Sequence, residues 1–323
     1  MNKYALISLS LLAGATTANY GYADNMKKSD DMKMTTKASS TMSSKAMSSN
    51  EMSANAMKSN KSMAMGKTGK MKMMSDKVSM QVQPNKVLDE IAHNIEVKGM
   101  SADNAFKLAL QNPQRPMKER LKDIDRKPVE VIEFAGIKPG MRVLNLLSYY
   151  GYYAEVLAYR LGNEGRVLAH NTPKYKSTIK NIESRLIESK IGNITPFVSK
   201  LVDISLDKPV DTIMFMSSYH DFYGYLEKDK NQRIEILRNL KKSLKPGGHI
   251  IVSDMVEKPG KHDPKIHRIH QQLVLDEFIA AGYEIIAQSD MLRKPMLDDH
   301  STKGYDKKRF YTDRWLMKLT PQS

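Results

Sequence analysis

The sequence predicts a doubly wound α/β domain with a buried, mostly parallel sheet. Short apolar segments alternate with amphipathic helical patterns between residues 142 and 287. A Pro-Gly pair at residues 139–140 introduces the first apolar segment, and a Leu-Lys-Pro-Gly-Gly turn at residues 244–248 introduces the one that ends at Asp254. Strands that helices cover on both faces are apolar along their length, so this alternation indicates a parallel sheet between helices.

Helical patterns precede the predicted sheet. Residues 84–112 carry apolar positions at helical spacing, with a break at Gly99 and a new N-cap at Ser101. Two prolines end this region. A basic and acidic stretch at residues 120–128 leads into a further helix, which closes at Gly136. We expect these helices to cover one side of the domain.

The α/β pattern itself contains seven predicted strands. They span residues 142–146, 166–170, 196–201, 210–216, 249–253, 284–287 and 309–319. The helices between them span residues 153–161 and 174–190, a segment with apolar positions from Ile234 to Leu244, and residues 273–281. In the last strand, Trp315, Met317 and Leu319 alternate with their neighbours, which predicts an antiparallel strand near the sheet edge.

Two segments before the folded part have strongly biased compositions. Residues 1–23 begin with Lys3, continue as an apolar run and end in small residues, which is the order of a secretory signal peptide with cleavage before Asp24. We therefore expect a periplasmic or secreted protein. An uncleaved anchor is the alternative, but the run is shorter than the roughly 20 residues that span a bilayer. No other segment is apolar enough to span one.

Residues 24–80 consist mainly of Met, Lys, Ser, Ala, Asn and Thr, so this tail is predicted to be disordered. Thirteen of the 23 methionines lie in it. Thioethers are soft ligands that suit Cu(I), so weak Cu(I) binding at several sites is one interpretation, and a sacrificial sink for oxidants is a second. A solvated spacer is the third. The chain thus divides into a signal peptide (1–23), this tail (24–80), a helical lead-in (81–127) and the α/β domain (128–320).

Composition excludes several classes of function. The chain has no cysteine, which rules out disulfides, thiolate metal sites and a cysteine nucleophile. The net charge is +15, and roughly half of it lies in the first eighty residues. In the folded part, basic and acidic residues are interspersed and no basic run carries aromatic residues, so we expect no dedicated nucleic-acid partner.

Motifs from about Arg115 to Leu319 suggest a family. They occupy residues 125–128, 136–141, 151–157, 219–221, 244–248, 292–295, 298–299 and 312–314. Together they resemble the exported branch of predicted class I S-adenosylmethionine-dependent methyltransferases. The resemblance implies a Rossmann-like, seven-stranded sheet, S-adenosylmethionine as the cofactor and a small-molecule methyl acceptor, whose identity the sequence does not reveal.

The predicted cofactor residues follow the strands, because ligands of such sheets bind outside the carboxyl ends of the strands. Asn145 ends the first strand, and Ser148 and Gly151 come directly after it. The resemblance implies that Asn171, after the second strand, meets the ribose hydroxyls. It implies that Asp203, after the third, meets the adenine amino group, although a solvated acid before a loop is the alternative for Asp203.

The first turn departs from the family pattern. An acid at the end of the strand and a glycine-rich turn are expected, since the cofactor presses against bare backbone. This chain has Asn145 for the acid and places Leu147, Tyr149 and Tyr150 in the turn, so that only Gly151 matches. Side chains could therefore fill the cofactor's space.

The triplet Tyr219, His220 and Asp221 follows the fourth strand, where methyl acceptors bind in this fold according to the resemblance. An imidazole with a pKa of about 6.5 can take a proton from an acceptor, and an adjacent carboxylate can orient or charge it. The alternative is a structural histidine that holds a neighbouring loop.

Three further histidines raise the question of a metal site. His267 and His270 are three residues apart, a spacing that places two side chains on one helix face, and His300 lies near Asp298 and Asp299. The sequence does not show that a third ligand lies close to the pair, so we predict no metal site.

Two functions remain open. The first is methyl transfer from S-adenosylmethionine to an unknown acceptor. The second is a binding protein of the cell envelope that keeps the fold but has lost the cofactor, with the methionine-rich tail as a Cu(I)-binding appendage. A nicotinamide dehydrogenase is disfavoured, because no Gly-x-Gly-x-x-Gly follows the first strand. Whether the chain is an enzyme is left undecided by the sequence.

Overall fold

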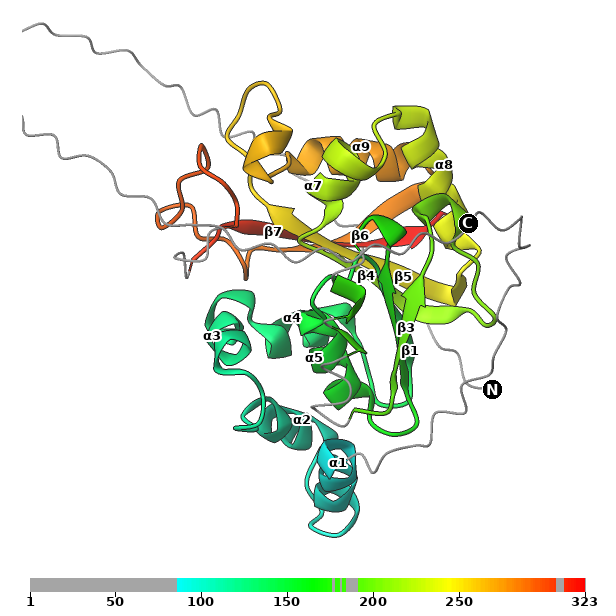
Figure 1. Cartoon of the computed structure of the whole chain (residues 1–323), viewed down its shortest axis with the longest axis vertical. Coiled ribbons are helices and arrows are strands. Elements are labelled where there is room, and N and C mark those ends of the chain that lie inside the picture. Colours follow the sequence, from blue (N-terminus) through cyan, green and yellow to red (C-terminus); the bar gives the residue numbers. More distant parts are fainter. Residues whose placement is uncertain (1–85, 176–177, 181, 184–190, 306–310, 323) are drawn as a thin grey trace, which may run out of the picture. The chain divides into compact units, whose positions relative to one another are not determined.

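Seven strands of the described chain form one sheet in the order β3-β2-β1-β4-β5-β7-β6 (Figure 1). They are β1 Arg142–Asn145, β2 Arg166–Asn171, β3 Ile194–Val198, β4 Val210–Met216, β5 Leu244–Met255, β6 Tyr283–Ser289 and β7 Arg314–Pro321. Strands β1 to β5 pair in parallel, and β7 runs antiparallel to β5 and β6. This confirms the predicted fold class, a doubly wound, Rossmann-like, seven-stranded sheet, and the antiparallel strand near its edge.

The computed structural model describes residues 86–175, 178–180, 182–183, 191–305 and 311–322. The predicted signal peptide (1–23), the tail (24–80) with its predicted Cu(I) sites and much of the predicted helix at residues 174–190 lie outside these ranges. Within them, no helix combines the length and apolar character needed to cross a membrane.

Helices cover both faces of the sheet. They are α1 Lys86–Glu96, α2 Ala102–Leu110, α3 Met117–Arg126, α4 Pro128–Ala135, α5 Tyr152–Leu161, α7 Tyr219–Asp221, α8 Lys230–Lys241 and α9 Gln271–Ala280. Shorter turns of helix are η1 Pro173–Tyr175, η2 Leu201–Asp203, η3 Phe222–Leu226 and η4 Pro264–Ile266. Figure 1 shows α4 and α5 on one side of the sheet and α7, α8 and α9 on the other.

Alternation along the strands divides the core into two layers, because successive side chains of a strand point to opposite faces. Val143, Met214 and Ile251 pack in the layer formed with α1, α2, α4 and α5. Leu144 and Ile213 pack in the layer formed with α8 and α9. As expected, the N-terminal helices therefore cover one side of the sheet.

The direction of winding reverses at β1, which lies between β2 and β4. From β1 the chain proceeds to β2 and β3 on one side and returns to β4 and β5 on the other. In open sheets of this type, ligands bind at such a reversal, outside the carboxyl ends of the strands. The loops after β1 and β4 meet at this place.

The predicted helix ends agree with the structure at two positions. The Ser101 side chain accepts a hydrogen bond from the Asn104 backbone N–H and caps α2. Gly136 ends α4 with a φ of 70°, a left-handed conformation that glycine adopts without steric cost.

Four element predictions differ from the structure. The third strand spans Ile194–Val198 rather than residues 196–201, because the chain turns into η2 at Leu201. Leu244 does not continue α8 but begins β5, because Pro246 cannot extend a helix and Gly247 has a φ of 76°. The last strand begins at Arg314, since the backbone N–H groups just before it bond to the carboxylates of Asp125 and Asp298. Residues 117–126 form α3, a helix that the highly polar composition of this stretch concealed.

Candidate functional site

Three residues of the loop after β1 have the left-handed backbone conformation that favours glycine, although only one of them is a glycine. Leu147 has a φ of 49°, Tyr149 a φ of 48° and Gly151 a φ of 81°. Residues with side chains rarely adopt this left-handed region, and holding them there costs on the order of 1–3 kcal/mol each. Gly151 is the N-cap of α5, and no side chain caps this helix. Its first backbone N–H groups therefore lie at the carboxyl edge of the sheet.

Hydrogen bonds to the end of β2 hold this strained loop in place. The Ser148 backbone N–H donates to the His170 carbonyl oxygen over 2.8 Å. The Asn171 side chain bonds both backbone groups of Tyr149: its Oδ1 accepts from the N–H at 2.8 Å and its amide donates to the carbonyl oxygen at 3.2 Å. Asn171 is 1 % exposed. Its buried amide is already used to hold the loop, and any ligand would have to share it.

The Tyr149 side chain joins the two loops at the reversal point. Its hydroxyl donates to Asp221 Oδ2 over 2.5 Å, and its ring meets that of Tyr175 edge to face at 5.2 Å. Burial, with the neighbouring Asp221 charge, raises the pKa of Tyr149 far above its ordinary value. Tyr149 is therefore a neutral donor that links the loop after β1 to the loop after β4.

His220 is fixed by a buried carboxylate. Its Nδ1 lies 2.9 Å from Asp254 Oδ1, and its backbone N–H donates to Asp254 Oδ2 over 2.9 Å. Asp254 is completely buried. Burial opposes protonation of His220, but the carboxylates of Asp254 and Asp221 outweigh it and raise the pKa. With Nδ1 engaged, Nε2 is the nitrogen that faces Asp221, at 3.5 Å.

His267 completes a cluster around Asp221. Its Nδ1 lies 3.3 Å from Asp221 Oδ1, in a direction that makes no hydrogen bond. Its ring stacks on Tyr225 at 5.3 Å and meets Tyr305 edge to face at 4.5 Å. Burial raises the pKa of Asp221, but the nearby imidazoles and the Tyr149 hydroxyl outweigh burial and hold it below its ordinary value.

Potential metal-ligating atoms of His220, Asp221 and His267 all lie within 4.8 Å of one another. This grouping differs from the histidine and carboxylate cluster considered from the sequence. His267 and His270 share no helix face, since His267 follows η4 and His270 is the N-cap of α9. His270 pairs with Glu257, and His300 pairs with Asp313.

The predicted catalytic triplet is only partly brought together. His220 and Asp221 lie side by side, whereas the Tyr219 side chain is directed into the core, where its hydroxyl donates to Glu277 over 2.8 Å. Glu277 also pairs with buried Arg233. Tyr219 therefore belongs to a buried structural network between α7, α8 and α9.

Four of the five predicted cofactor residues lie at the ends of β1 and β2. They are Asn145, Ser148, Gly151 and Asn171. Asp203 ends η2 beyond the edge strand β3, is exposed and lines a shallow hollow with Asn239 and Lys242 of α8 and its C-cap. Among the described residues, no hydrogen bond or ion pair joins Asp203 to the other four.

Sequence reasoning missed Tyr149 and the place of His267. Tyr149 appeared only as a bulky residue in a turn that should hold glycines, and its role depends on a contact 72 positions away. His267 reaches Asp221 because the chain after β5 folds back over η3, which no local pattern reveals. Asp254 was expected at the carboxyl edge because it follows the fifth predicted strand, but its bond to His220 was not foreseen.

Buried polar atoms without a hydrogen bond gather at the carboxyl edge. In the described chain, those in the last residues of a strand or in the loop after one are Asn145 Oδ1, Ser148 Oγ, Thr172 Oγ1, Ser218 Oγ and Ser253 Oγ. An unsatisfied buried polar group costs about 1–3 kcal/mol, so native proteins pair such groups with protein, water or ligand. These atoms and the α5 N-terminus fit the polar groups of an adenosyl cofactor.

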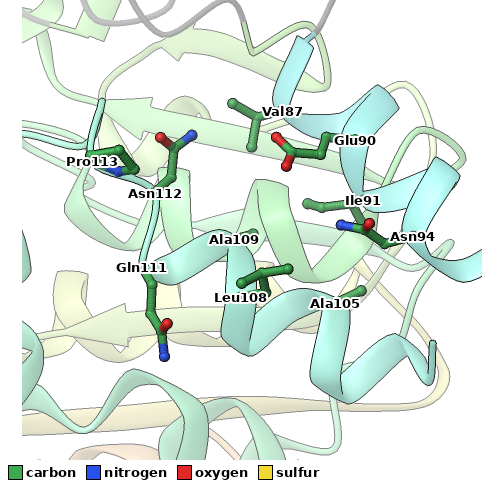
Figure 2. A pocket seen from close by; sticks show the side chains of 10 residues that line it. All are labelled: Val87, Glu90, Ile91, Asn94, Ala105, Leu108, Ala109, Gln111, Asn112 and Pro113. Carbon is green, nitrogen blue, oxygen red and sulfur yellow. The ribbon is translucent and has the colours of Figure 1, made fainter. Parts of the chain in front are cut away.

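A half-open hollow lies elsewhere, between α1 and α2. It has a volume of about 270 Å³, and Figure 2 shows the side chains of these helices and of the segment after α2 that line it, among them Glu90, Asn94 and Gln111. It is not at the carboxyl edge of the sheet, and Glu90 is the one titratable residue among the described residues that line it.

Comparisons with known proteins give distant structural likenesses. A SAM-dependent methyltransferase from Aquifex aeolicus shares 17% identity at a TM-score of 0.45, over 64% of this chain and 98% of that one. The glycopeptide N-methyltransferase MtfA, complexed with sinefungin, shares 16% at 0.43, over 61% and 86%. The [4+2]-cyclase SpnF shares 16% at 0.46, over 62% and 81%. No protein-family model and no curated protein matches the sequence.

At identities and TM-scores this low, none of these likenesses indicates what the chain does. The fold class rests on the strand order and strand directions of its own sheet.

Proposed function

We propose that this chain binds S-adenosylmethionine at the carboxyl edge of its sheet and transfers the methyl group to an acceptor beside His220 and Asp221. The observation that supports this most is the set of buried, unpaired polar atoms at the ends of β1 and β2. They lie at the reversal of strand order, where ligands of doubly wound sheets bind.

The residues divide into a cofactor side and an acceptor side. On the cofactor side, Asn145, Ser148 and the first N–H groups of α5 would hold the carboxylate and amino group of the methionine part. Asn171 and Thr172 would hold the ribose hydroxyls. The Asn171 amide has a second hydrogen and a second lone pair that Tyr149 does not use, and the Thr172 hydroxyl has no partner. The bound cofactor would supply an activated methyl group.

On the acceptor side, the buried carboxylate of Asp254 fixes His220 so that Nε2 faces Asp221. A nucleophile that lies beside this pair could lose its proton to Nε2, and the two carboxylates would stabilise the charged imidazole. The acceptor is a small molecule in this proposal; its structure is not specified by the site.

A titration of S-adenosylhomocysteine into the purified full chain tests the proposal. We expect a dissociation constant in the micromolar range. Asn171→Ala should weaken binding at least tenfold, because the amide both shapes the loop and meets the ribose. Asn193→Ala is the matched control, since Asn193 is equally buried but its amide bonds the Ala158 and Gly162 carbonyls.

A second function is favoured by one observation. The hydroxyl of Tyr149 already bonds Asp221, and the amide of Asn171 already bonds the loop. A binding protein of this fold that has lost the cofactor would keep such a closed arrangement. No binding of S-adenosylhomocysteine at millimolar concentration would favour this alternative and contradict methyl transfer.

A further inference from the structure

We propose that His220 Nε2, Asp221 Oδ1 and His267 Nδ1 bind one divalent first-row transition-metal ion of the zinc type. The site lies at the loop after β4 and draws its third ligand from the segment between η4 and α9. The inference goes beyond the proposed function and changes one role in it: with the ion bound, His220 is a ligand rather than a proton acceptor.

The distances from Asp221 to the two histidines suit a tetrahedral ion. Bonds of about 2.0–2.1 Å in tetrahedral directions place neighbouring ligand atoms about 3.3 Å apart. Asp221 Oδ1 lies 3.5 Å from His220 Nε2 and 3.3 Å from His267 Nδ1. The two histidine nitrogens lie within 4.8 Å of each other, so they would have to approach each other to complete the tetrahedral spacing.

Each ligand is oriented by a neighbour on its far side. Asp254 holds Nδ1 of His220, and the Tyr149 hydroxyl holds the second carboxylate oxygen of Asp221. Tyr305 approaches Nε2 of His267 at 3.4 Å. In metal sites, a carboxylate or other partner commonly bonds the ring nitrogen that is not bound to the metal, and so fixes tautomer and ring direction.

The charge of the cluster also calls for a cation. Asp221 and Asp254 are two carboxylates at most slightly exposed, and their ion-pair partners among the described residues are histidines rather than lysines or arginines. When both imidazoles are neutral, as metal binding requires, the two carboxylates carry about two negative charges. Buried charges are normally paired or bound to a metal, and a divalent ion would balance them.

The ligand types select the class of metal. Two imidazoles and one carboxylate are the protein ligands of many catalytic zinc sites, and such sets also hold iron(II). Mg²⁺ prefers oxygen ligands in octahedral geometry and should bind here poorly. The methionine-rich tail contains no histidine or cysteine, so we expect zinc to bind at this cluster and not at the thioethers of the tail.

Zinc titration of the full chain, stripped with chelator and desalted, tests the inference in competition with a chromogenic zinc indicator. We expect one zinc ion per chain, unaffected by excess Mg²⁺. His267→Asn should lower zinc affinity about 100-fold or more. Asparagine is the suitable substitute because His267 has a φ of 51°, which asparagine adopts more readily than most residues.

His270→Asn is the matched control. It makes the same substitution three residues away, at the N-cap of α9, and should leave zinc affinity unchanged. Asp254→Asn should lower zinc affinity about 10- to 100-fold, as expected for loss of the partner that orients a ligand. Should His267→Asn not fold, as judged by circular dichroism, Asp221→Asn replaces it in the comparison.

Absence of zinc binding by the wild-type chain would overturn the inference, as would equal zinc affinity of the wild type and the ligand variants. The S-adenosylhomocysteine titration is made without added metal, so failure of the zinc site and failure of the proposed function give separate results.

Discussion

Tyr149 links the two loops that meet at the carboxyl edge. It connects the loop after β1 with Asp221, and its backbone is held by Asn171. If a ligand lies between these loops, the tyrosine side chain must turn aside and give up its bond to a charged carboxylate. Hydrogen bonds to charged groups contribute about 1.5–3 kcal/mol, so opening the site has a substantial cost.

Tyr149→Phe should therefore bind S-adenosylhomocysteine about tenfold or more tightly than the wild type, because about 1.4 kcal/mol corresponds to a factor of ten. Calorimetric titration measures this. Tyr159→Phe is the control: it also removes one buried hydroxyl donor, which bonds Glu155, but away from the site. Equal or weaker binding by Tyr149→Phe would show that the hydroxyl does not obstruct the ligand.

His170 gives the fold a dependence on pH. Burial lowers the pKa of its imidazole to about 4, and its Nε2 lies 3.2 Å from the Ser199 carbonyl oxygen. The folded pKa is below the unfolded value of about 6.5, so the unfolded chain binds the proton more readily. The neutral, buried imidazole therefore makes its full contribution to the free energy of unfolding above about pH 6.5. This contribution is lost as the pH falls toward about 4.

In this window the free energy of unfolding should fall by up to about 1.4 kcal/mol per pH unit on account of His170. Urea unfolding of the wild type and of His170→Gln at several pH values measures the difference. The two curves should converge as the pH falls from about 6.5 toward about 4. A constant difference would show that His170 is not neutral in the folded state.

At the scale of single residues, position after a strand predicted which residues lie at the carboxyl edge, whereas residue type did not predict their side-chain contacts. Asn145, Ser148, Gly151 and Asn171 could be placed at one edge because each follows a strand. The bond between Tyr149 and Asp221 could not be foreseen, since it depends on side-chain direction in two loops. Tyr219 was misjudged for the same reason: its neighbours in sequence face the site, but its own side chain enters the core.

At the scale of elements, a buried ion pair fastens the N-terminal helices to the sheet. Asp125, at the end of α3, accepts a hydrogen bond from Arg314 at the start of β7 over 2.5 Å and pairs with Lys294 at 3.0 Å. Burial raises the pKa of Asp125, but these cations outweigh it and hold the pKa below its ordinary value. The motifs at residues 125–128, 292–295 and 312–314 are thus parts of one anchor.

Asp125→Ala should lower the free energy of unfolding by about 3–5 kcal/mol, because it leaves buried Arg314 without its charged partner. Urea unfolding measures this. Asp207→Ala is the control, since Asp207 is largely exposed, pairs with Arg142 at the surface, and should cost about 1 kcal/mol or less. Equal losses in the two variants would contradict the anchoring role.

Element types were largely predictable because burial on both faces leaves continuous apolar strands, and β4 was predicted with its bounds correct. The predicted ends of elements were wrong where side chains bond backbone N–H groups that a strand would otherwise use. The start of β7 is set by Asp298 and by Asp125, which lies 187 positions from its partner Thr312. Helix α3 was missed because its contacts are ion pairs rather than an apolar stripe.

At the scale of the whole molecule, the reversal of strand order concentrates chemistry in one place. The strained loop after β1, the unpaired polar atoms and the His220, Asp221 and His267 cluster all lie at the carboxyl edge, although they come from segments more than 100 residues apart in the sequence. Alternating strands and helices predict such an edge but not the order of the strands, and hence not which loops meet.

The central claim is that this edge binds the ligand. Hydrogen–deuterium exchange of the full chain, with and without S-adenosylhomocysteine, tests it directly, because bound ligand should slow exchange of the backbone amides that it covers. We predict protection of residues 146–154 and 171–175, with α1 and α2 unchanged. Protection confined to the hollow between α1 and α2, or none at saturating ligand, would contradict the claim.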